Sequence, residues 1–72
     1  MRIENDIADA IESFLTVQLR VMKRSIEQGK SILVAEHCGQ DWTKYEGGQY
    51  SVLNKISTFD LMKCLVNGYE II

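Results

Sequence analysis

Residues 5–28 have the sequence NDIADAIESFLTVQLRVMKRSIEQ, which contains neither glycine nor proline. Acidic residues gather at its start and basic residues near its end, as the dipole of a helix favours. Gly29 follows directly, and glycine is typical just after a helix. Apolar residues recur at helical spacing in and just before the stretch, at Ile3, Ile7, Ile11, Phe14, Leu15, Val21, Met22 and Ile26. The pattern predicts one long N-terminal amphipathic helix over residues 5–28.

The apolar side of this helix is unusually wide. At about 100° per residue, its apolar positions spread over roughly 200° of the helix surface. A helix that lies on a single sheet needs an apolar face of only about 100° or somewhat more. We therefore expect a second apolar partner, which is either a second copy of the same helix or a target protein. We favour a homodimer or higher oligomer in which a second copy covers the edge of the arc. Its candidate interface residues are Leu15, Leu19, Met22 and Ile26.

The rest of the chain predicts a small sheet and one short helix. Residues 31–37 form an apolar run of strand length, and residues 42–46 and 49–56 flank Gly47-Gly48, a typical hairpin turn. Ser57 and Asp60 resemble a helix-capping box, so a helix is expected from there to about Val66, ended by Asn67-Gly68. Residues 69–72 then form an edge strand or an apolar tail.

These elements predict an α+β fold in a single small domain, residues 1–72. The long N-terminal amphipathic helix packs on a small, mainly antiparallel sheet, and the second short helix lies near the C-terminus. The expected core residues are Ile7, Ile11, Phe14, Leu33, Val52, Ile56, Phe59, Leu65 and Val66, and the short helix is also expected to bury Met62.

Composition narrows the class of protein. The chain has 72 residues, 46% of them hydrophobic, and a net charge of −2, so neither intrinsic disorder nor a dominant phosphate-binding surface is expected. No apolar run approaches the roughly 18 residues of a membrane span, and the N-terminus is too acidic for a signal peptide. Two cysteines, Cys38 and Cys64, are too few for a disulfide framework. We expect a cytoplasmic protein with reduced thiols.

The residues that usually perform catalysis are scarce. His37 is the only histidine, and on a strand its side chain would point away from that of neighbouring Cys38. One histidine and two cysteines do not provide the four ligands of a structural zinc site, and no glycine-rich loop precedes a Lys-Ser/Thr pair. The sequence therefore predicts no enzyme activity, no metal and no cofactor.

Three aromatic residues favour a binding function. Trp42, Tyr45 and Tyr50 gather around glycines in a polar region, and such side chains are enriched at interaction hot spots. They are our candidate partner-binding residues, with a place in the core as the alternative. The leading hypothesis is a non-catalytic protein-binding module that blocks or modulates another macromolecule.

Two other functions stay open. A dimeric DNA-binding regulator could use the basic residues Arg20, Lys23, Arg24 and Lys30, although the charge balance makes nucleic acid a less favoured partner. A small-ligand sponge could form a pocket between subunits around Tyr50 or Tyr69.

In size, absence of proline and scarcity of catalytic residues, the chain resembles the short accessory proteins of bacteriophages and other mobile elements. The resemblance involves no motif. It implies an inhibitor or modulator that binds a host enzyme or defence complex.

Overall fold

The structure is a computed structural model that describes residues 1–39, 42 and 50–72. Helices dominate these residues. The elements follow one another in the order β1 (Arg2–Ile3), α1 (Asn5–Arg20), α2 (Ile26–Cys38), the 3₁₀ helix η3 (Ser51–Lys55), α3 (Thr58–Asn67) and β2 (Glu70–Ile71).

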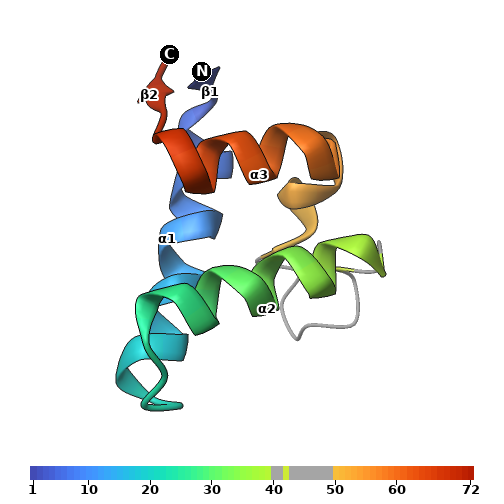
Figure 1. Cartoon of the computed structure of the whole chain (residues 1–72). Coiled ribbons are helices and arrows are strands. Elements are labelled where there is room, and N and C mark those ends of the chain that lie inside the picture. Colours follow the sequence, from blue (N-terminus) through green and yellow to red (C-terminus); the bar gives the residue numbers. More distant parts are fainter. Residues whose placement is uncertain (40–41, 43–49) are drawn as a thin grey trace.

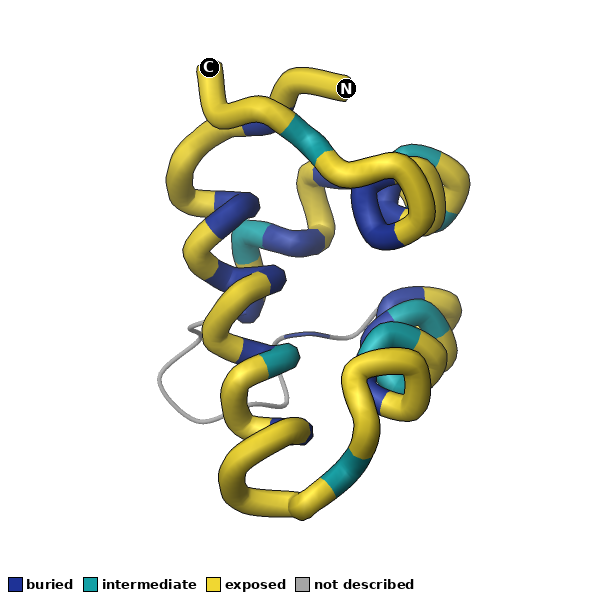
Figure 2. The backbone as a smooth tube through the Cα atoms, turned by 60° about the vertical axis from the view of Figure 1, so that its left-hand side comes forward, coloured by how far each residue is buried: buried dark blue, intermediate teal, exposed yellow. Residues whose placement is uncertain are grey.

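The three α-helices form two layers. Helices α2 and α3 lie side by side and run in opposite directions, and α1 crosses both of them (Figures 1 and 2). Figure 2 shows that the buried backbone lies where the three helices face one another. The core residues come from every element except β2: Ile3, Ile7, Ala8, Ala10, Ile11, Phe14, Leu33, Trp42, Tyr50, Leu53, Ile56, Leu61, Cys64 and Leu65.

The predicted helix over residues 5–28 is wrong because the chain turns after Arg20. Lys23 adopts a positive φ of 58°, which a helix does not permit. The Arg24 guanidinium donates to the side-chain oxygen of Gln18 over 2.6 Å and so fastens the turn to α1. Ser25 then starts a new helix with a capping box, in which its hydroxyl accepts from the Gln28 N–H at 3.2 Å and its own N–H donates to the Gln28 side chain at 3.0 Å.

The predicted strand over residues 31–37 is also wrong, since these residues belong to α2. The capping box at Ser25 directs the chain into a helix, and the strand preference of Ile32 and Val34 is too weak to prevent it. Gly29 lets α2 approach α1 closely, because a Cβ at this position would lie only 3.2 Å from the Cβ of Gln18.

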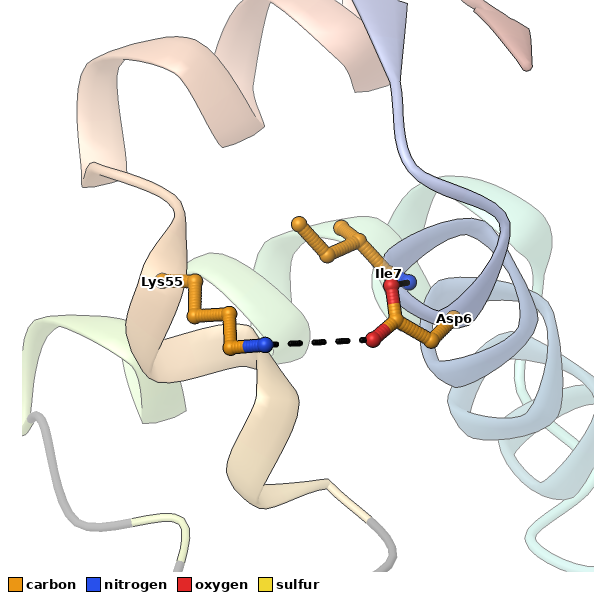
Figure 3. Close-up of polar contacts among 3 residues, drawn as sticks. All are labelled: Asp6, Ile7 and Lys55. Atoms are coloured by element: carbon orange, nitrogen blue, oxygen red, sulfur yellow. Dashed lines mark hydrogen bonds and ion pairs between the residues drawn. The ribbon is translucent and has the colours of Figure 1, made fainter. Parts of the chain in front are cut away.

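The predicted hairpin is contradicted where the structure describes it. Its turn at Gly47-Gly48 and most of its first strand lie outside the described residues. The second strand is wrong, since Ser51–Lys55 form η3. This short helix lies against α1, where the Lys55 ammonium is 4.0 Å from a carboxylate oxygen of Asp6 and the other oxygen of that carboxylate accepts from the Ile7 N–H at 2.8 Å (Figure 3).

Helix α3 is confirmed as an element, but the prediction of its buried face is largely wrong. The Ser57 hydroxyl accepts from the Asp60 N–H at 3.1 Å, and the helix ends before Gly68, whose φ is 81°. Leu61, Cys64 and Leu65 face the core, whereas Phe59, Met62 and Val66 are exposed. Val52, another expected core residue, is only partly buried.

The only sheet among the described residues is a parallel pair of two-residue strands, β1 and β2. Glu70 donates to the carbonyl of Met1 at 2.8 Å, and Ile72 donates to that of Ile3 at 2.9 Å. The predicted α+β fold with a mainly antiparallel sheet is therefore wrong, and the structure is mostly helical.

Candidate interaction surface

Two of the three candidate partner-binding aromatics lie in the core. Trp42 and Tyr50 are 0% and 4% exposed. Their rings meet edge to face, with centroids 5.8 Å apart, and both contact the ring of Phe14 in the same manner at 5.7 and 5.5 Å. The structure thus corresponds to the core alternative for Trp42 and Tyr50, while Tyr45 lies outside the described residues.

His37 completes this aromatic cluster as its polar member. The indole N–H of Trp42 donates to Nδ1 of His37 at 2.8 Å, and Nε2 of His37 donates to the carbonyl of Ile56 at 2.6 Å. Because Nδ1 must accept, the ring is a neutral imidazole with its proton on Nε2. Both nitrogens are occupied inside the core, so His37 joins α2, Trp42 and the end of η3 rather than offering a catalytic base.

The two cysteines differ in exposure. Cys38 is exposed although it follows buried His37, and both thiols are free. Burial raises the pKa of the Cys64 thiol, which lies 3.5 Å from the sulfur of Met1. Within the described ranges, no group of three or more His, Cys, Asp or Glu residues is arranged to hold a metal ion.

The four basic residues of the DNA-binding alternative do not form one free surface. Arg24 donates to Gln18, and the ammonium of Lys30 donates to the carbonyl of Leu65 at 3.0 Å, near the end of α3. Arg20 and Lys23 are exposed at the corner between α1 and α2. A phosphate backbone would thus meet two cations that already have acceptors within the chain.

The two tyrosines of the ligand-sponge alternative have different surroundings. Tyr50 belongs to the buried aromatic cluster. Tyr69, which follows α3, is partly buried, and its hydroxyl donates to a carboxylate oxygen of Glu12 on α1 at 3.5 Å. Burial and the Glu12 charge raise the pKa of Tyr69. A ligand pocket between subunits at either tyrosine stays a prediction.

The four candidate dimer residues no longer lie on one helix. Leu15 is partly buried on α1. The other three are exposed: Leu19 before the turn, Met22 within it and Ile26 after it. Their regular spacing produces a continuous stripe only on an unbroken helix. An interface at these residues stays a prediction, without the geometry that suggested it.

A different apolar surface lies on the outer side of α3. We call Phe59, Met62 and Val66 the α3 stripe. They are 67%, 46% and 80% exposed, and their spacing of three and four residues places them on one side of the helix. The ammonium of Lys63 lies 4.6 Å from the centre of the Phe59 ring and covers part of it.

A groove between α2 and α3 continues this stripe. The α2–α3 groove has a volume of about 350 Å³ and is lined by Lys30, Ser31, Val34, Met62, Leu65 and Val66. Met62 and Val66 belong to both features. Among the described residues of its lining, the only charged group is the ammonium of Lys30, which donates to the Leu65 carbonyl. Stripe and groove together form one apolar surface across the two helices.

The sequence analysis missed this surface because it assigned one apolar face to the short helix. Residues 58–67 have the sequence TFDLMKCLVN, in which Leu61, Cys64 and Leu65 form one apolar side, while Phe59, Met62 and Val66 form another. A helix with apolar residues on both sides needs two partners. The signal was present in the pattern, but the choice between the two sides required the positions of α1 and α2.

Comparison of the chain with protein-family models, with curated proteins and with solved structures found no match. Among the described residues, no helix is both long and apolar enough to cross a membrane.

Proposed function

We propose that this protein is a small non-catalytic interaction module that modulates another macromolecule by covering part of its surface. One observation carries the proposal. Helix α3 is capped at its start, and Leu61, Cys64 and Leu65 hold it in the core. Phe59, Met62 and Val66, on its other side, stay exposed. Exposed apolar side chains that adjoin a groove are typical of protein-binding surfaces.

The shape of the surface favours a helical partner. The groove runs between two antiparallel helices, and its lining is apolar apart from Lys30 and Ser31. An amphipathic helix buries residues at spacings of three and four in such a groove. Binding there would occlude the partner helix, which is the mode of action expected of an inhibitor or modulator.

The test is a co-purification from cells that express a tagged and an untagged copy of the chain. Wild type is compared with Val66→Lys, which places a charge on the α3 stripe, and with Asn67→Lys, which adds the same charge to the exposed neighbour. We expect Val66→Lys to lose the captured proteins at least tenfold, and Asn67→Lys to retain them. Equal capture by all three chains would contradict the proposal.

A further inference from the structure

The turn between α1 and α2 combines positive charge with exposed apolar side chains. We call residues 19–26, with the sequence LRVMKRSI, the α1–α2 corner. We propose that the α1–α2 corner binds the surface of a membrane that contains anionic lipids. The corner lies at one end of the molecule, away from α3 and from both termini (Figures 1 and 2). It is therefore a second surface, independent of the one that carries the proposed function.

Every apolar residue of the α1–α2 corner is exposed. These residues are Leu19, Val21, Met22 and Ile26. In the free chain, water covers their side chains, at a cost in free energy. The boundary between the headgroups and the acyl chains of a bilayer takes up such side chains, as it does those of amphipathic segments that lie on a membrane. Binding of this kind requires no spanning helix.

The cations of the corner outnumber the acidic residues near them in the sequence. Arg20, Lys23 and Arg24 lie between Glu12 and Glu27, with no acidic residue in between. Glu12 is eight residues before Arg20, about 12 Å along the helix, which exceeds the Debye length of about 8 Å at physiological salt. Only Glu27, at the start of α2, offsets one of the three cations. The corner therefore keeps a positive charge, although the whole chain is acidic.

The backbone of the corner is fixed before it meets a membrane. The Met22 N–H donates to the carbonyl of Val17 at 3.1 Å, and the Arg24 N–H donates to that of Gln18 at 2.9 Å. The bond from the Arg24 guanidinium to the Gln18 side chain adds a third link, and it leaves the guanidinium charged and with further donors. Binding thus has little backbone left to order, which reduces its cost in entropy.

A bilayer fits the corner better than a nucleic acid does. Both offer phosphate groups to cations. Proteins that bind duplex DNA through its backbone make about 6–10 phosphate contacts, whereas the corner has Arg20, Lys23 and Arg24. A duplex also offers no apolar phase to the four exposed apolar residues, while a bilayer buries them below its headgroups. The apolar side chains therefore decide between the two partners.

The composition of the corner sets how strongly it binds. One myristoyl chain gives a membrane-binding constant of about 10⁴ M⁻¹. The four apolar side chains bury less surface than such a chain, because each is already partly covered by the protein. Each cation near an anionic surface contributes about fivefold to binding. We expect half of the protein to be bound at about 1 mM lipid.

Fluorescent labelling tests which part of the chain meets the lipid. In a chain whose exposed thiol is removed by Cys38→Ser, Met22→Cys carries an environment-sensitive dye at the corner, and Met62→Cys carries the same dye on α3. These positions are a matched pair, since Met22 and Met62 are 48% and 46% exposed, and Cys64 is buried away from the reagent. With phosphatidylcholine vesicles that contain about 30 mol% phosphatidylserine, we expect the emission at position 22 to rise about twofold and move to shorter wavelength. The emission at position 62 should not change.

Removal of one cation tests the role of charge. Lys23 has a positive φ of 58°, which asparagine tolerates better than most residues, so Lys23→Asn removes the charge without disturbing the turn. Lys63→Asn removes an exposed cation from α3 and is the matched control. In co-sedimentation with the same vesicles, we expect Lys23→Asn to bind about fivefold more weakly than wild type. Lys63→Asn should bind like wild type.

The same measurements show when the corner is not a membrane site. Absence of wild-type binding at about 10 mM lipid in about 0.1 M salt would overturn the inference, as would equal binding to vesicles of phosphatidylcholine alone. An equal response of the dyes at positions 22 and 62, or an equal loss in the two asparagine variants, would place the contact elsewhere and overturn it as well. Binding of duplex DNA that Lys23→Asn weakens, without binding of vesicles, would assign the corner to nucleic acid instead.

Discussion

The aromatic cluster and the α3 stripe both consist of large, mainly apolar side chains, but those of the cluster are buried and those of the stripe are exposed. Phe14, Trp42 and Tyr50 are buried around His37, whereas Phe59 is 67% exposed on α3. The polar atoms of the cluster find partners: Trp42 donates to His37, and His37 donates to Ile56. Residue type therefore does not decide burial. What distinguishes the cluster is that α1, α2 and η3 converge on it, while the stripe lies on the outer side of α3 and borders α2 across a groove.

Because the aromatic cluster is buried and the stripe is exposed, we expect removal of Trp42 to cause the largest loss of stability. Trp42→Ala leaves a cavity beside Phe14 and Tyr50, and it leaves Nδ1 of His37 without a donor. We expect the free energy of unfolding to fall by about 3–5 kcal/mol, enough to unfold a small domain. Urea denaturation measures this loss. Phe59→Ala, which removes an exposed ring, should cost under about 1 kcal/mol, and equal losses would remove the distinction between the two regions.

Replacing His37 tests the polar centre of the cluster. His37→Phe keeps a ring of similar shape, but it removes the acceptor of the Trp42 N–H and the donor to the Ile56 carbonyl. We expect a loss of about 2–3 kcal/mol in urea denaturation, because two buried polar groups lose their partners. Cys38→Ser, at the exposed neighbouring position, is the control and should change stability little. A His37→Phe chain as stable as this control would show that the two hydrogen bonds contribute nothing.

The cap of α2 should matter less than the cluster that α2 helps to form. Ser25→Ala removes the hydroxyl that accepts from Gln28, and the expected loss is about 1 kcal/mol. Ser31→Ala, within the same helix but without a capping role, should be neutral or slightly stabilising. Thermal unfolding followed by circular dichroism compares the two. Should both variants melt together, the turn after Arg20 must be fixed by something other than the capping box.

Raising the pH into the alkaline range should gradually lower the free energy of unfolding, because the Cys64 thiol is buried on the inner side of α3. Burial raises the pKa of the Cys64 thiol above its ordinary value of 9.0, so the folded chain holds this proton more tightly than the unfolded chain. The contribution of this thiol to stability is therefore fully present below its ordinary pKa and is lost as the pH rises towards the folded pKa. Urea midpoints at pH 7 and pH 10 measure the change. Cys64→Val should show less of this decline, and the rest is expected from Tyr50 and Tyr69, whose pKa values burial also raises.

Altering the stripe should affect the isolated chain least of all. Val66 is 80% exposed, so Val66→Lys should change the free energy of unfolding by no more than about 0.5 kcal/mol, as substitutions of exposed residues usually do. Urea denaturation measures this effect. A loss above about 2 kcal/mol would mean that Val66 is packed against the chain itself, and the stripe would then belong to the core.

Local signals predicted local structure well. The capping pattern at Ser57 and the glycine at residue 68 located α3, and the apolar spacing of Ile7, Ile11 and Phe14 identified the buried side of α1. The error began at residue 21, where the apolar period continued through a turn. The sequence Ser25-Ile-Glu-Gln28 contains a capping box that marks the start of a second helix, and this signal was not used.

One misplaced helix boundary changed the assignment of the residues that follow it. Residues 31–37 were assigned to a strand, although they belong to a second helix. The candidate site could not be found for a related reason. Which side of α3 is buried depends on α1 and α2, and residues so distant in sequence leave no trace in the local pattern.

The pairing of β1 with β2 has a consequence for the order of folding. Arg2 lies beside Glu70, so this contact joins two segments separated by almost the whole chain. Two residues in each strand provide too few hydrogen bonds to close so long a loop unaided. We therefore expect the pair to form after the helices have packed. A fluorescent donor at one of these strands and an acceptor at the other would thus report the final step of chain assembly.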